Sequence, residues 1–202
     1  MATHPALRPG RFIYYKFLNS LFLGLSVGAV FVLYTPLSPA VFSAGGIGLA
    51  IGTLVVATQY QRILAAGWFF HLSLLVELVT LSGVVAVLAL PLELPLALFV
   101  YIGYQITFAL GSYLVRCETL LLVSVDQLRK LDVAKQAGYL LGMAMAWGIY
   151  SGLASGAQIE DRTEQVVALH WVLVVIECLV IVALWRAFDR QQLQAVTPLT
   201  TP

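Results

Sequence analysis

Residues 12–60 read FIYYKFLNSLFLGLSVGAVFVLYTPLSPAVFSAGGIGLAIGTLVVATQY and contain a single charged side chain, that of Lys16. A helix needs about 20 mostly apolar residues to cross the hydrocarbon core of a bilayer. The stretch holds two runs of this length, 12–34 and 39–60, and the segment TPLSP at 35–39 separates them. Because proline interrupts a helix, this segment predicts a turn between two membrane spans.

The composition extends this prediction to the whole chain. Of 202 residues, 60% are apolar and 10% are charged, against about 45–50% and 25% in soluble domains. So little charge cannot cover a water-exposed surface. We therefore expect an integral membrane protein in contact with the lipid bilayer, in a bacterial inner (plasma) membrane. The net charge is +1 and the sequence has no basic stripe with interleaved aromatics, so we expect no nucleic-acid partner.

Four further apolar runs follow the first two. Pro91 and Pro95 bracket the turn between the third and fourth runs, and polar connectors at 127–132 and 158–165 precede the fifth and sixth. We predict an all-α, polytopic membrane helix bundle, with a transmembrane domain at 1–190 and a flexible C-terminal tail at 191–202. The six predicted transmembrane helices are 12–34, 39–60, 67–90, 95–125, 134–156 and 166–188.

The basic residues predict that both ends of the chain lie in the cytoplasm. With the N-terminus inside, Arg162 lies in an outer loop and Arg116 within the fourth span, and all other lysines and arginines lie inside. This distribution follows the positive-inside rule. The first run lacks a cleavage site of small residues, so we expect a retained span. The cytoplasmic residues are Arg8, Arg11, Lys16, Arg62, Arg129, Lys130, Lys135, Arg186 and Arg190.

Two glutamates lie near the middle of predicted spans, where ionisable groups are costly and point to function. Glu77 in the third span and Glu177 in the sixth are 100 positions apart, in the similar strings LLVELV and LVVIECLV. This similarity predicts a 3+3 repeat, inverted because each half has an odd number of spans. Either the two carboxyls titrate protons, or each is neutral or hydrogen-bonded in a helix contact. His71 and His170 precede them and are expected near opposite membrane faces.

The fourth span carries a polar stripe. Gln105, Ser112 and Arg116 fall within about 40° of one another on a helical wheel, and Asn19 and Ser26 share a face of the first span. Such faces should contact protein or water and not lipid, so these five residues predict a substrate pathway. Alternatively, Arg116 extends to the cytoplasmic headgroups.

Small residues recur at helical spacing in the second and fifth spans. Rows of this kind let helix backbones approach closely. Tight packing is the default interpretation, and a moving contact between helices is the alternative. The residues are Gly45, Gly46, Gly48 and Gly52, then Gly138, Gly142, Ala146, Gly148, Gly152 and Gly156.

The sequence has no catalytic or cofactor-binding signature. It contains no HExxH, P-loop or nucleophile elbow, and no pair of histidines at haem-ligand spacing within one helix. Cys117 and Cys178 lie in apolar runs without disulfide or metal spacing. We expect a protein that is not an enzyme and holds no cofactor or metal.

Residues 111–152, GSYLVRCETLLLVSVDQLRKLDVAKQAGYLLGMAMAWGIYSG, resemble the span-four, loop and span-five region of the major facilitator superfamily. Both have a mid-span glycine, an acidic residue before a charged loop (here Asp126), and a glycine-spaced helix after it. Residues 17–39 resemble that family's opening helix. The loop at 52–67, GTLVVATQYQRILAAG, departs from the family signature because it has no Asp and only Arg62 as a base.

The resemblance implies one six-helix half of such a transporter. In the family, the first and fourth spans line the central cavity, whereas the third and sixth lie behind it. The first hypothesis is a half-size transporter that acts as a homodimer in secondary transport of a small solute. The second is a non-transporting accessory or assembly subunit of a membrane complex, bound to another membrane subunit.

Overall fold

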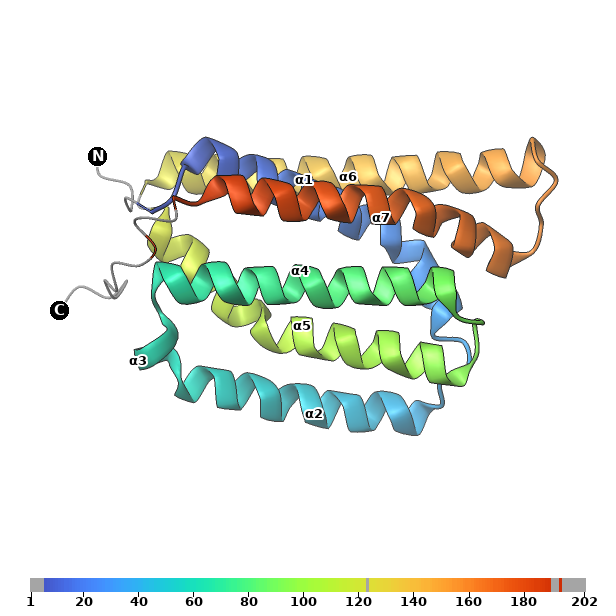
Figure 1. Ribbon diagram of the computed structural model, residues 1–202, viewed down its shortest axis with the longest axis horizontal. Helices are drawn as coiled ribbons and strands as arrows, with labels where there is room; N and C mark the ends of the chain where they lie inside the picture. The colour runs from blue at the N-terminus through green and yellow to red at the C-terminus, as the bar shows by residue number, and fades with distance from the viewer. Residues whose placement is uncertain (1–5, 123, 190–192, 194–202) are drawn as a thin grey trace.

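The computed structural model describes residues 6–122, 124–189 and 193. These residues form seven α-helices, and all except the short α3 run roughly along the long axis of the molecule (Figure 1). The prediction of an all-α fold is confirmed. The helices are α1 (Pro9–Leu33), α2 (Pro39–Thr58), α3 (Tyr60–Ile63), α4 (Ala66–Ala89), α5 (Leu94–Leu121), α6 (Val125–Ser155) and α7 (Arg162–Ala187).

The helix starts follow from local sequence. Proline occupies the first turn of α1, α2 and α5, where its missing N–H leaves no hydrogen bond unmade. Ser124 caps α6 by accepting a hydrogen bond from the Gln127 N–H, and Asp161 caps α7 by accepting one from the Glu164 N–H. Because of these caps, α6 begins just before the predicted connector 127–132, and α7 begins within the predicted connector 158–165.

Five of the described helices are long and apolar enough to cross a membrane: α1, α2, α4, α5 and α7. The chain is therefore a polytopic membrane protein. α6 is the longest helix but is less apolar, because charged residues occupy its first turns and Gly, Ala, Ser and Tyr occupy much of the remainder. The predicted fifth span, 134–156, is thus helical without being distinctly hydrophobic.

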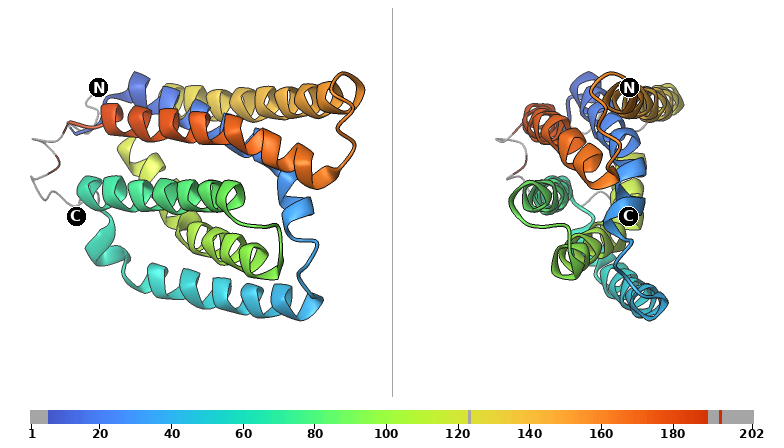
Figure 2. Two further views of the ribbon diagram at one scale, coloured as in Figure 1. Left: turned by 45° about the vertical axis from the view of Figure 1, so that its right-hand side comes forward. Right: turned by 90° about the vertical axis from the view of Figure 1, so that its right-hand side faces the viewer.

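The long helices form two groups. Figure 1 shows α1, α6 and α7 on one side of the bundle and α2, α4 and α5 on the other. α1 packs against α6 and α7, α7 against α4, α4 against α5, and α5 against α2. α1 and α5 are inclined to the other helices, so each reaches from its own group toward the other. α2 has no buried residue and lies at the margin of the bundle (Figure 2).

The backbones of α1 and α6 approach each other at three glycines. A methyl group on Gly142 would collide with the Leu21 carbonyl oxygen, and one on Gly24 would collide with the Tyr139 carbonyl oxygen. Gly138 meets the α1 backbone in the same way, and Ala146 is buried. The predicted close packing by Gly138, Gly142 and Ala146 is therefore confirmed.

The remaining glycines of the two predicted rows behave differently from one another. Gly45 lies against the Tyr101 ring and Gly52 against the Ala109 methyl group, so these two hold α2 against α5. Four others, Gly46, Gly48, Gly148 and Gly152, have open space where a side chain would be, so the prediction of close packing is wrong for them. At Gly156, an added methyl group would meet only the Gly152 carbonyl of its own helix.

The two ends of the described chain meet at one end of the bundle. The Arg8 N–H donates to the Ala187 carbonyl and the Asp189 N–H to the Ala6 carbonyl, each at 2.9 Å. An Arg8–Asp189 ion pair at 3.2 Å adds to this contact. The predicted flexible tail, 191–202, lies outside the described residues except for Leu193.

We predict that Gly142→Ala destabilises the protein by about 1–3 kcal/mol, because the added methyl group forces α1 and α6 apart. Gly152→Ala is the matched control. It lies on the same helix in open space, so the higher helix propensity of alanine should make it neutral or stabilising by up to about 1 kcal/mol. Thermal denaturation in detergent, followed by circular dichroism, measures both. Equal effects of the two variants would contradict the close crossing.

Candidate functional site

A buried carboxyl group joins α1 to α4. Glu77 is 1% exposed, and one of its oxygens accepts a hydrogen bond of 2.5 Å from the Tyr15 hydroxyl. The Asn19 amide lies 3.2 Å from both Glu77 oxygens and donates to the same group. Tyr15 and Asn19 are four residues apart, so they lie on one face of α1. The Asn19 of the predicted pathway therefore contacts a glutamate of the third span.

Glu177 of α7 lies next to this group. It is fully buried, and its carboxyl lies close enough to that of Glu77 for the two to interact. Neither Glu177 oxygen accepts a hydrogen bond from a donor group among the described residues. The two glutamates that the sequence singled out are thus brought together at the contact between α4 and α7.

A second buried network lies nearer the end that carries the chain termini. The Lys16 ammonium is 2.6 Å from one Glu118 oxygen, and the Lys135 ammonium is 3.2 Å from the other. Lys16 is 6% and Glu118 4% exposed, so this ion triad ties α1, α5 and α6 together inside the bundle. Lys16 also lies over the Tyr15 ring, at 5.0 Å from its centroid, which places the triad beside Glu77.

Sequence reasoning missed this triad. It counted Lys16 and Lys135 as cytoplasmic charges, and it concluded only that Glu118 does not face Arg116 on its helix. A signal was present, because Lys16 is the single charge in the apolar stretch 12–60 and an isolated charge in such a run needs a partner. The partner lies about a hundred positions away in the sequence, and no local pattern points to it.

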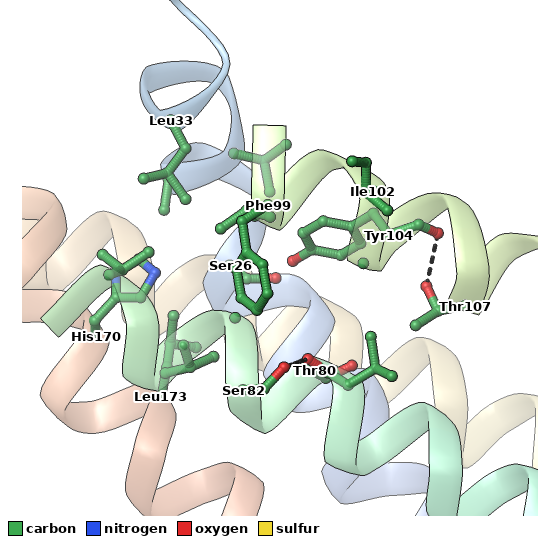
Figure 3. A pocket seen from close by; sticks show the side chains of 18 of the residues that line it. Ser26, Leu33, Thr80, Ser82, Phe99, Ile102, Tyr104, Thr107, His170 and Leu173 are labelled. Carbon is green, nitrogen blue, oxygen red and sulfur yellow. Dashed lines mark hydrogen bonds between the residues drawn. The ribbon is translucent and has the colours of Figure 1, made fainter. Parts of the chain in front are cut away.

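A cavity of about 210 Å³ lies between α1, α4, α5 and α7, toward the end away from the chain termini. Its walls are mostly apolar, and its polar side chains are Ser26, Thr80, Ser82, Tyr104, Thr107 and His170. Figure 3 shows the Tyr104 hydroxyl pointing toward Ser26 across the cavity. The cavity is partly open, because the lining residues Phe99 and Ile102 are exposed. An apolar cleft with a few polar groups is the usual form of a small-molecule site. Ser26 of the predicted pathway lines it.

The predicted stripe on α5 lies outside this cavity. Ser112 and Arg116 are exposed, and both are near Tyr60: the Tyr60 hydroxyl is 3.4 Å from the Ser112 hydroxyl, and the Arg116 guanidinium is 5.9 Å from the ring centroid. Gln105 lines a groove between α2 and α5, and its buried oxygen has no hydrogen-bond partner within the described chain. The structure therefore separates these three residues from Asn19 and Ser26.

The histidines and cysteines form no metal site in the part of the chain that the structure describes. His71 is exposed and His170 buried, and each lies 2.7 Å from a backbone carbonyl of its own helix through Nδ1. Cys117 is buried and Cys178 exposed, and both are free thiols. Comparison of the chain with models of protein families, with curated proteins and with solved structures finds no match.

We predict that Lys16→Met destabilises the protein by about 3–5 kcal/mol, because it leaves the buried Glu118 carboxylate with only the partly exposed Lys135. The double variant Lys16→Met with Glu118→Met should recover much of this loss, because the buried carboxylate is gone and the remaining cation, Lys135, is partly exposed to solvent. The midpoint of denaturation in detergent measures both effects.

The control is Lys130→Met. Lys130 pairs with Asp126 at 2.6 Å on the exposed start of α6, where Lys130 and Arg129 hold the pKa of Asp126 below its ordinary value through hydrogen bonds. Exposed pairs contribute about 0–1 kcal/mol, so this variant should change stability little. A Lys16→Met effect no larger than that of Lys130→Met would contradict a buried triad.

Proposed function

We propose that the chain is one half of a major-facilitator-like transporter of a bacterial inner membrane, and that two copies act together in secondary transport of a small solute. One observation carries this proposal. The packing order of the long helices is α6, α1, α7, α4, α5, α2. Each of the first three long helices can be exchanged with one of the last three: α1 with α5, α2 with α6, and α4 with α7. The order then becomes α2, α5, α4, α7, α1, α6, which is the original order reversed.

This self-matching order is what an inverted 3+3 repeat requires. Under the exchange, the α1–α6 contact corresponds to α5–α2, the α1–α7 contact to α5–α4, and the α4–α7 contact to itself. Both members of the first pair have a glycine at the contact: Gly142 lies against the α1 backbone, and Gly45 lies against the Tyr101 ring of α5. The glutamate pair lies at the self-related contact. An odd number of spans in each half inverts the second half relative to the first.

The placement of the ends supports six crossings with both termini in the cytoplasm. The described ends of the chain, the α3 turn and the α5–α6 connection all lie at one end of the bundle (Figure 1). Eight of the nine basic residues assigned to the cytoplasm are in the described segments. Six of them belong to helix ends and connections at this end, and Lys16 and Lys135 lie further along α1 and α6. α6 then adds one crossing to the five made by α1, α2, α4, α5 and α7. Its modest hydropathy fits a position beside α1, against which Gly138 and Gly142 pack.

The exposed surface supports a second copy as partner. Ser112, Arg116 and Thr119 form an exposed polar row on α5, and polar groups at membrane depth normally face protein or water. α2, beside α5, buries nothing within one chain. A copy related by two-fold symmetry would cover both helices and supply the second wall of a pathway. The proposed pathway residues are Asn19, Ser26, Gln105, Ser112 and Arg116.

A topology prediction follows from six crossings. In a background with Cys117 and Cys178 changed to Ala, a membrane-impermeant maleimide should label Glu160→Cys, in the α6–α7 turn, on intact cells. Gln61→Cys, in α3, should react only after permeabilisation. Ser38→Cys, in the α1–α2 turn, is the positive control. Labelling of Glu160→Cys only after permeabilisation would mean that α6 does not cross the membrane.

Transport is tested with purified protein in lipid vesicles. We expect uptake of at least one member of a panel of radiolabelled amino acids, sugars, organic acids and organic amines, above that of protein-free vesicles. Arg116→Ala should lower that uptake at least tenfold, and Arg62→Ala, a basic residue outside the α5 row, should change it little. Unchanged uptake in Arg116→Ala would remove this residue from the mechanism.

The oligomeric state separates transport from the alternative function. Ser112→Cys should form a disulfide-linked dimer in the membrane on mild oxidation if the α5 rows of two copies face each other. A protein that stays monomeric in lipid, transports no panel solute and co-purifies with a different membrane subunit would instead be an accessory or assembly subunit.

A further inference from the structure

The buried ionisable groups of the bundle do not balance in charge. The connected network contains two ammonium groups, Lys16 and Lys135, and three carboxyls, Glu77, Glu118 and Glu177. With every group ionised, one negative charge would remain inside the membrane without compensation. An uncompensated buried carboxylate costs several kcal/mol or more, and such groups normally become neutral.

The contacts show which of the three carboxyls lacks compensation for a negative charge. Glu118 lies between both ammonium groups, so it is compensated as a carboxylate. Glu77 accepts hydrogen bonds from Tyr15 and Asn19 and lies in the field of Lys16. Glu177 has neither a hydrogen-bond donor nor a cation assigned to it within the described residues, and the group that it faces is the Glu77 carboxyl.

We propose that Glu77 and Glu177 form a shared binding site for one proton, which is the coupling ion of the proposed transport. The proton comes from water, binds a Glu177 oxygen and turns that group into a hydroxyl donor toward the Glu77 carboxylate. On release it returns to water and leaves two facing carboxylates. Two such carboxylates repel each other in an apolar site, so the pair holds one proton at neutral pH and releases it only when the pH rises, as paired acids in other proteins illustrate. The proton site stands without the transport function, whereas its coupling role rests on it.

The surroundings of the pair favour a proton over a metal cation. No group of three metal-ligating side chains exists in the described segments, so a metal ion would lack ligands. The titratable groups that act on the pair are a phenol and an ammonium from α1, a phenol from α5, a thiol from α7 and, through Tyr15, the Glu118 carboxylate. They are Tyr15, Lys16, Tyr104, Cys178 and Glu118.

The same pair adjoins the cavity, which gives the proton a route to influence a bound solute. Thr80 and Leu173 line the cavity one helical turn from Glu77 and Glu177, respectively. Tyr104, another lining residue, is close enough to Glu177 to interact with it electrostatically. Binding or loss of the proton changes the charge at the base of the cavity. Binding of a solute in the cavity and binding of the proton should therefore each change the affinity of the other.

Infrared spectroscopy of the full-length protein in lipid tests the site without any solute. At neutral pH the wild-type protein should show the C=O stretching band of a protonated carboxyl, which shifts in D₂O and disappears at alkaline pH. Glu177→Gln should abolish the band, because Glu77 stays ionised beside Lys16, Tyr15 and Asn19. The double variant with Glu77→Gln should also lack it. Glu164→Gln, on the exposed first turn of the same helix, should keep it.

Three results would overturn the proposal: no such band in the wild-type protein at neutral pH, persistence of the band in the double variant, or its loss when sodium replaces potassium at constant ionic strength. The last result would mean that sodium occupies the site. Because the wild-type titration needs no variant, misfolding of a glutamate variant leaves the test intact. A band with the expected behaviour in a protein without uptake would refute the transport function alone.

Discussion

Where α1 crosses α6, Gly24, Gly138 and Gly142 leave no room for a side chain between the two backbones. In lipid, helices gain little from burying apolar side chains against each other, because the hydrocarbon is equally apolar. Close packing and polar contacts hold them together instead. This crossing sets the position of α1, whose remaining surface then meets α7, α4 and α5. The polar contacts of the bundle interior depend on that position.

Three successive polar positions of α1 show this dependence. Tyr15 and Asn19 reach Glu77 of α4, and Lys16, on an adjacent face, reaches Glu118 of α5. α1 thus supplies hydrogen-bond donors to a carboxyl group of α4 and a cation to a carboxylate of α5, and Lys135 of α6 completes the triad. The group left over is Glu177 of α7. Among the described residues, Glu177 is therefore the buried carboxyl for which these contacts supply no donor or cation.

The sequence predicted the helical class and most span positions, and it singled out the two mid-span glutamates that the structure buries, because each of these depends on local chemistry. Hydrophobic length identifies a span, proline and polar residues end it, and a carboxyl in an apolar run is conspicuous without any neighbour. The glycine row of α6 was predicted for its inner part and wrong for Gly148 and Gly152. The spacing of small residues does not show at which residue the contact with the neighbouring helix ends.

The amino-acid sequence by itself determined that the chain lies in a membrane, that it is helical, and which polar side chains lie at membrane depth. Only the tertiary structure decided which of these groups meet. It paired Glu77 with Glu177 and Lys16 with Glu118, and it placed Arg116 on the surface of α5. The physical reason is that hydropathy is a property of each residue. Compensation of a buried charge, in contrast, depends on which helices meet, and in this chain the paired side chains come from helices about a hundred residues apart in the sequence.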